Sequence, residues 1–241
     1  MRSRKLLVAL SAGVAILLAC ADSTGPPITP QDPEDQGGNN PTLQMLRWDP
    51  SVPLQFAAEP GGEEGVLHSP VTVPPLDRPE VSFWATRGTA TSVRINYLSE
   101  DFTWLPFLDL TLSQTSLLAW PDGESFESGE RVLITVRVDT VELRAHIEPV
   151  GLMFNFQDPA RLTLWYTGAD PDLNRDGIID VLDDTIERER LRIWTQPNPF
   201  DPWIALDATQ SVEDKQFLAD LDGAASHSGY AVSFSGYAVS Y

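Results

Sequence analysis

From Val81 onward, apolar residues recur at every second position in short runs that are separated by turn residues. Because alternate side chains of an extended strand point to opposite faces, this period of two predicts strands with one buried face. The clearest run is RVLITVRV at 131–138, where Val132 and every second residue after it are apolar. On the same basis we expect strands at 81–86, 91–98, 107–112, 142–148, 161–166, 191–195 and 215–221, and a pair of strands within 230–241.

Many short strands with little helix predict an all-β protein, built as an antiparallel β-sandwich or barrel. The one-sided alternation favours sheets with one solvated face, and of the two architectures we expect the sandwich. Only 181–190 has helical character, and it is short. In such a fold the seven tryptophans are expected in the core or between the sheets. An alternative use for them is an exposed platform that stacks on sugars.

Four short segments resemble a known kind of sandwich. They are a β-rich run at 132–138, HIEPVGLMF at 146–154, DPARLTLWY at 158–166 and FSGYAV at 234–239. Together they are similar to the domain shared by zona-occludens proteins, netrin receptors and ankyrins. The resemblance implies an interaction or scaffold module rather than an enzyme.

The C-terminus contains a repeat, since SGYAVS occurs at 228–233 and again at 235–240. The two copies are seven residues apart, and an odd shift reverses the faces of a continuous strand. Either a turn or bulge separates the copies, or one copy alone lies in the sheet.

A long insertion at 168–190 departs from the pattern of that domain. Within it, 172–183 reads DLNRDGIIDVLD and resembles the twelve-residue EF-hand loop. Gly177 occupies the sixth position, where the chain turns sharply, and Ile179 is expected to pack the loop on its support. The expected ligands are side-chain oxygens and, at the seventh position, a main-chain carbonyl, from Asp172, Asn174, Asp176, Ile178, Asp180 and Asp183.

This ligand set predicts Ca²⁺, which takes six to eight hard oxygen ligands. Asp183 stands where Glu is usual. Dockerins and other bacterial calcium loops, which this loop resembles, often end in Asp at the same position. A dockerin carries two such loops, so a single loop disfavours that role. We expect weak binding, with a dissociation constant on the order of 0.1 to 1 mM, and a structural role that pins the insertion against the sandwich. The competing interpretation is an acidic turn without a metal.

The N-terminus has a different pattern. Basic residues within 1–5 precede an apolar run at 6–18, which as a helix is roughly 20 Å long against a hydrocarbon core of about 30 Å. This order and length indicate a secretory signal rather than a spanning helix. The run ends in LLAC, which resembles the lipobox of bacterial lipoproteins and predicts a lipid on Cys20. Ordinary cleavage after Ala21 is the alternative, and it predicts a soluble secreted protein.

These patterns divide the chain into a signal peptide at 1–19, a tether at 20–80 and a sandwich at 81–241 that carries the insertion. The tether holds 12 of the 20 prolines between residues 21 and 80, and its first part lacks the apolar side chains needed to offset the entropy of ordering. Short edge strands are allowed within it at 42–48 and 65–73.

The composition excludes some classes of binding partner and of metal site. The formal net charge is −19, and removal of the leader takes away basic residues and makes the chain more acidic still. Such a chain repels nucleic acid and anionic lipid headgroups. Cys20 is the one cysteine, which excludes an intramolecular disulfide and a zinc site of the cysteine type.

No residue cluster indicates an active site. The histidines His68, His146 and His227 are scattered without ligand spacing, and the glutamates at 124–130 fit a solvated turn. We therefore expect a non-enzymatic lipoprotein of the bacterial cell envelope, structural or partner-binding, with one structural calcium ion and a membrane anchor at Cys20. The alternative is a surface domain that binds carbohydrate or processes glycans.

Overall fold

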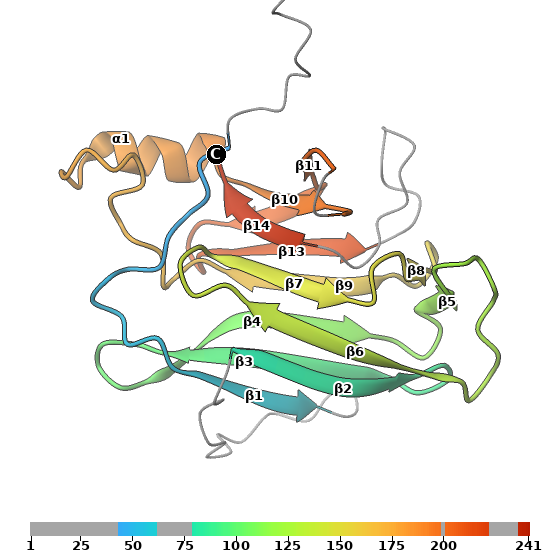
Figure 1. The fold of residues 1–241 in the computed structure, drawn as a ribbon. Coiled ribbons are helices and arrows are strands. Elements are labelled where there is room, and N and C mark those ends of the chain that lie inside the picture. Colours follow the sequence, from blue (N-terminus) through green and yellow to red (C-terminus); the bar gives the residue numbers. More distant parts are fainter. Residues whose placement is uncertain (1–42, 62–78, 199–200, 222–235) are drawn as a thin grey trace, which may run out of the picture. The chain divides into compact units, whose positions relative to one another are not determined.

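The period-two runs form two six-stranded sheets in which neighbouring strands are antiparallel (Figure 1). The structure is a computed structural model, and it describes residues 43–61, 79–198, 201–221 and 236–241. All of these residues belong to one unit, Asn40–Tyr241.

The strands of the first sheet are, in spatial order, β1 (Phe56–Gly61), β3 (Thr91–Leu98), β4 (Trp104–Leu112), β9 (Ala160–Trp165), β13 (Gln216–Leu221) and β12 (Ala208–Ser211). Those of the second are β11 (Ile204–Ala205), β10 (Arg192–Gln196), β14 (Gly236–Ser240), β7 (Arg144–Glu148), β6 (Arg131–Val138) and β2 (Glu80–Thr86). The remaining elements are a small sheet of β5 (Leu117–Ala119) and β8 (Met153–Phe154), and a helix, α1 (Val181–Thr185), that continues as a π-helical segment, Ile186–Arg190.

The core lies between the two sheets. Every second residue of β6 is buried, beginning at Val132, and these side chains belong to the same cluster as buried residues of the first sheet, such as Val93 and Leu108. Burial of one face of each sheet against the other is the interaction that holds a sandwich together. The structure confirms the predicted all-β antiparallel sandwich with one short helix.

Most strands lie where the alternation places them, and β3 and β6 have the predicted bounds. β4 begins at Trp104, earlier than the predicted start at 107. The part that the prediction missed contains Pro106. A proline lacks the N–H of a ladder, and the pairing of β4 with β3 shifts register between Ile95 and Asn96, where Asn96 faces Pro106. This bulge interrupts the period of two that the prediction used.

Part of the stretch that we predicted as a tether packs on the sandwich. β1, which was not predicted, adds an edge strand beside β3. Within the edge strand that was allowed at 42–48, Met45 and Arg47 form isolated bridges to Ser240 and Glu142. Residues 65–73, the leader and Cys20 lie outside the described residues.

β14 is one strand of the pair that was expected at the C-terminus. It lies in the middle of the second sheet, hydrogen-bonded to β10 on one side and to β7 on the other. The second strand of the pair stays a prediction. The second copy provides β14, and the first lies outside the described residues.

The tryptophans also differ from the expectation. Trp48 is the one that belongs to the buried core, whereas Trp84 is 52% exposed and the other five are half-buried. The ring of Trp84 lies under the guanidinium of Arg131, 4.5 Å from its centroid. Indole rings are therefore available at the surface of the sandwich.

Candidate metal centre

The backbone of the 172–183 loop turns as the spacing predicts. Gly177 has a φ of 85°, and Arg175 has a φ of 62°. Nothing lies within 4 Å of the place where a Cβ on Gly177 would be, so glycine is favoured there by the backbone conformation and not by lack of space. The left-handed conformation of Arg175 directs the chain back on itself before that turn.

The first three candidate ligands fold back onto the loop. The Asp172 carboxylate accepts hydrogen bonds from the Asp176 N–H at 3.1 Å and the Gly177 N–H at 2.8 Å. Asn174 Oδ1 accepts from the Asp176 N–H at 2.8 Å, and Asp176 Oδ1 from the Ile178 N–H at 2.8 Å. Each oxygen can accept more than one interaction, so these bonds orient the side chains without excluding a cation.

Asp183 joins the two ends of the loop. Its carboxylate accepts from the Asn174 N–H at 3.2 Å and from the Asp180 N–H at 2.9 Å, and the residue is only 4% exposed. Burial by itself raises the pKa of Asp183, but the backbone N–H donors of Asp180, Asn174 and Leu173 outweigh it and hold the pKa below its usual value. The carboxylate is therefore charged at neutral pH.

The helix after the loop begins with a capping box. Asp180 is the N-cap of α1 and accepts from the Leu182 N–H at 2.7 Å, and Asp183 completes the box. The side chain of Ile178 is 62% exposed, and its main chain is held through its N–H. Ile179 is 67% exposed, so it does not pack the loop as predicted. Leu173, which is 9% exposed, is the apolar contact between the loop and the core.

The donor atoms of the loop determine which metal ion it could hold. Within the described residues, no three His, Cys, Asp or Glu side chains are grouped so as to hold a metal. Asp172, Asp176, Asp180 and Asp183 of the loop are therefore not gathered into such a group, and the remaining expected ligands are the Asn174 amide and the Ile178 carbonyl. All of its donors are oxygens, which fits a hard cation such as Ca²⁺ and not a soft transition metal.

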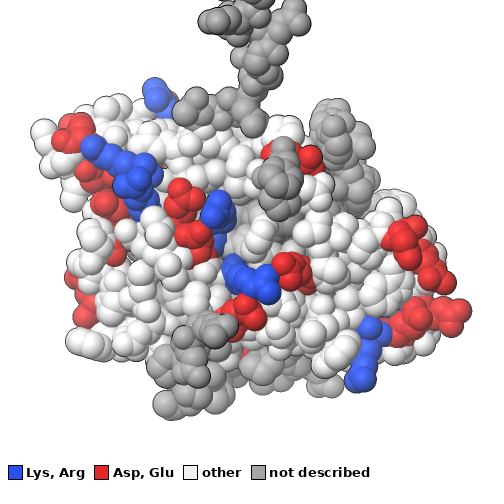
Figure 2. Space-filling model, viewed as in Figure 1, with Lys and Arg blue, Asp and Glu red and all other residues white. Residues whose placement is uncertain are grey.

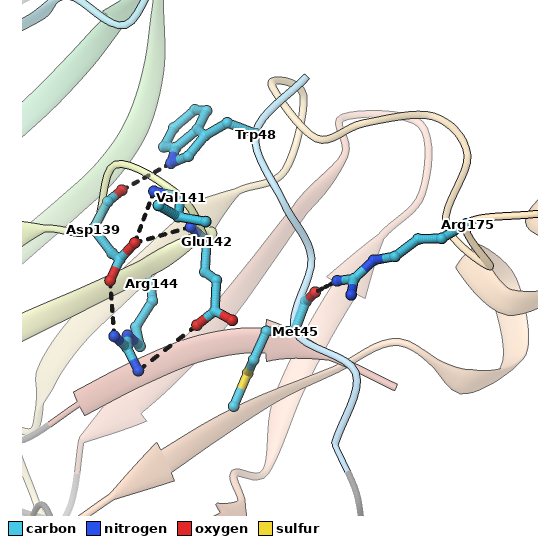
Figure 3. Close-up of polar contacts among 7 residues, drawn as sticks. All are labelled: Met45, Trp48, Asp139, Val141, Glu142, Arg144 and Arg175. Atoms are coloured by element: carbon cyan, nitrogen blue, oxygen red, sulfur yellow. Dashed lines mark hydrogen bonds and ion pairs between the residues drawn. The ribbon is translucent and has the colours of Figure 1, made fainter. Parts of the chain in front are cut away.

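The loop is docked through main-chain carbonyls. The Leu173 carbonyl accepts from Tyr241 Oη at 2.7 Å and from Gln44 Nε2 at 3.3 Å. The Arg175 guanidinium donates to the Met45 carbonyl, as Figure 3 shows. The loop thus contacts the end of the C-terminal strand and the first described residues of the chain.

Those first residues, 44–49, form what we call the clasp. The clasp hydrogen-bonds to β14 and to the residues just before β7, since the Leu46 N–H donates to the Val239 carbonyl and the Leu143 N–H donates to the Leu46 carbonyl, both at 2.9 Å. Further main-chain bonds join it to Val141, Gly168, Asp170 and Tyr241. The clasp therefore links three parts of the chain that are distant in sequence.

Trp48 anchors the clasp in the core. Its ring lies among those of Phe56, Tyr97 and Phe107, with centroids 4.9 to 5.4 Å away, and its Nε1–H donates to the Asp139 carbonyl at 2.9 Å (Figure 3). Gly168 lies against this ring: a Cβ there would come within 2.7 Å of Trp48 Cζ3.

The turn beneath Trp48 is held by one carboxylate. Asp139 accepts from the N–H groups of Val141 and Glu142 and from Arg144 Nη2 at 2.7 Å (Figure 3). Burial raises the pKa of Asp139, but these donors and the positive charge of Arg144 outweigh it and lower the pKa overall. No sequence pattern predicts this contact, because two of the donors to Asp139 are main-chain N–H groups.

No family model matches this chain, and neither the curated proteins nor the solved structures contain a significant match to it. Within the described residues, no helix is long and apolar enough to cross a membrane. The sequence predicted the sharp turn of the loop at Gly177. For the clasp it allowed a short edge strand at 42–48, but it did not indicate the partners of that segment.

Proposed function

We propose that this protein is a non-enzymatic, calcium-stabilised β-sandwich of the bacterial cell envelope, tethered by a lipid on Cys20 and acting in structure or in binding a partner. The observation that carries the proposal is the loop at 172–183, in which oriented oxygens and a docked backbone occur together. The leader pattern supports export, and millimolar Ca²⁺ suits an extracytoplasmic setting.

Calcium has a clear physical role at this loop. Asp172, Asp176, Asp180 and Asp183 place four carboxylates within twelve residues. A bound Ca²⁺ would draw these carboxylates together and would be held by them, the Asn174 amide and the Ile178 carbonyl. Because the unfolded chain does not assemble this set, binding would stabilise the folded state.

The contacts of Leu173 and Arg175 carry this stabilisation to the clasp. Gln44 and Met45 are the clasp residues that these two contact, and they lie within the stretch 20–80 that was predicted as a tether. Ordering of the loop by calcium would therefore strengthen the point at which the tether enters the fold. The resemblance at 132–166 and 234–239 supports an interaction or scaffold role for the sandwich itself.

Calorimetry and thermal melting test the calcium site. At 10 mM Ca²⁺ and a dissociation constant of about 0.1 to 1 mM, linkage predicts a gain of about 1.4 to 2.7 kcal/mol, or a rise in Tm of about 3 to 10 °C. EDTA should remove the gain, and Asp172→Asn should abolish it. Asp122→Asn, in an acidic turn elsewhere, is the matched control. Absence of binding heat together with an unchanged Tm would refute the site.

Metabolic labelling with palmitate tests the anchor separately. The wild-type chain should incorporate the label, and Cys20→Ala should not. An unlabelled wild-type chain that is found in the medium would favour cleavage after Ala21 and a soluble secreted protein. Neither result depends on calcium, so the two parts of the proposal are tested independently.

A further inference from the structure

A cleft of about 380 Å³ opens on the outer face of the second sheet. Its floor follows a cross-strand row, because Arg137 of β6 pairs with His146 of β7, His146 with Gly236 of β14, and Gly236 with Gln196 of β10. Neighbours in register on one face lie close together, so this row gathers polar side chains from distant parts of the chain. The cleft is lined by Arg137, Asp139, Arg144, His146, Gln196 and Trp203.

Gly236 is the one residue of this row without a side chain. A Cβ at that position would lie 3.4 Å from Trp203 Cη2 and 3.5 Å from His146 Nδ1. The absence of a side chain therefore leaves the indole on one side of the floor and the imidazole on the other. A larger residue would fill the space between them.

Trp203 lies between two fixed points of the chain. Two residues before it, the Asp201 carbonyl accepts from Gln196 Nε2 at 2.9 Å and the Asp201 carboxylate accepts from the Asn198 amide at 2.6 Å. The next residue, Ile204, pairs with Thr195 of β10. The indole is only half-buried, so part of it faces the cleft.

The charges at the cleft are balanced. Arg137 forms ion pairs with Glu80 at 2.6 Å and Glu148 at 2.8 Å, and Arg144 pairs with Asp139 at 2.7 Å. Figure 2 shows basic and acidic side chains in adjacent groups on the face that it draws. Because these guanidinium charges are already compensated and the chain has a net charge of −19, an anionic ligand is disfavoured.

We propose that this cleft binds a neutral saccharide. A sugar ring presents an apolar C–H face, which fits against the indole of Trp203, and a rim of hydroxyl groups. Arginine and glutamine donate to such hydroxyls, the Asp139 carboxylate accepts from them, and His146 offers two ring nitrogens for hydrogen bonds. The cleft is more polar than the usual apolar pocket for a small molecule, and one aromatic surface beside several polar groups suits a ligand with an apolar face and a polar rim.

Binding is tested with the full chain purified in detergent, with Ca²⁺ present throughout. The probes are cellohexaose, laminarihexaose and mannohexaose, with an oligogalacturonate, adenosine and an uncharged peptide as competitors of other chemistry. We expect one of the neutral hexaoses to bind and to shift the NMR signals of the His146 ring, which His146→Gln identifies among the three histidines. Trp203→Ala should weaken that binding about tenfold or more.

Matched controls separate this site from the calcium loop and from misfolding. Trp84→Ala removes an exposed indole of the same sheet outside the cleft, and it should change the affinity less than twofold. Asp172→Asn should bind the sugar like the wild type, so loss of the calcium site leaves the test intact. If Trp203→Ala does not fold, the His146 shifts of the wild-type chain decide the question.

Three results would overturn the proposal. They are the absence of binding by every neutral hexaose at 10 mM, binding that Trp203→Ala leaves unchanged in a folded protein, and stronger binding of the oligogalacturonate, adenosine or the peptide.

Discussion

Gly168 lies against Trp48 of the clasp, and its replacement by alanine tests how closely the clasp packs there. An added Cβ would lie 2.7 Å from Trp48 Cζ3, 3.0 Å from Trp48 Cε3 and 3.1 Å from Tyr97 Cε2. Trp48 is 6% exposed and Tyr97 is 1% exposed, so neither ring can turn into solvent. The methyl group can be accommodated only if the clasp moves.

Two effects of opposite sign decide how far Gly168→Ala changes the free energy of unfolding. Gly168 does not have a positive φ, so alanine is compatible with the backbone and gains about 0.4 to 1 kcal/mol through the unfolded state. Overpacking of a filled site costs about 1 to 3 kcal/mol. We therefore expect Gly168→Ala to lower the free energy of unfolding by about 1 to 2 kcal/mol and Tm by about 3 to 8 °C.

Urea unfolding followed by circular dichroism measures this effect, and a double-mutant cycle assigns it to Trp48. In a Trp48→Phe background the smaller ring should reduce the cost of Gly168→Ala by about 1 kcal/mol. The reasoning is refuted if Gly168→Ala is as stable as the wild type, or if its cost is the same in both backgrounds.

Three further predictions each concern a single residue. Tyr241→Phe removes the hydrogen bond to the Leu173 carbonyl and should cost about 1 kcal/mol in urea unfolding, with a smaller rise in Tm on adding Ca²⁺; an unchanged stability would contradict the docking of the loop. Gly177→Ala forces a Cβ onto a φ of 85° and should cost about 1 kcal/mol and weaken calcium binding, whereas wild-type affinity would show that the turn is not needed. Burial raises the pKa of Tyr166 to about 12, above its usual value of 10, so its stabilising effect is present below pH 10 and is lost as the pH rises towards 12. Between pH 9 and pH 11 the wild type should lose about 1 kcal/mol more than Tyr166→Phe, and equal losses would contradict this pKa.

The alternation of the sequence determined most strands, because side-chain period is a local property of an extended chain. The run at 131–138 predicted both the bounds and the buried face of β6. β1 escaped prediction because FAAEPG has no alternation, and it is a strand only because it pairs with β3. The loop at 172–183 was predictable for a similar reason, since its twelve positions and its glycine turn are close together in the chain.

Contacts between distant segments were decided by the tertiary structure alone. The loop docks through the carbonyls of Leu173 and Met45, and every residue has a carbonyl, so no sequence pattern marks these two. The cleft likewise depends on strand order, which brings His146 beside Gly236. Spacing along the chain thus determined the strands and the loop of this protein. The pairing of strands decided where the loop is held and which side chains meet, because pairing joins residues that the sequence keeps apart.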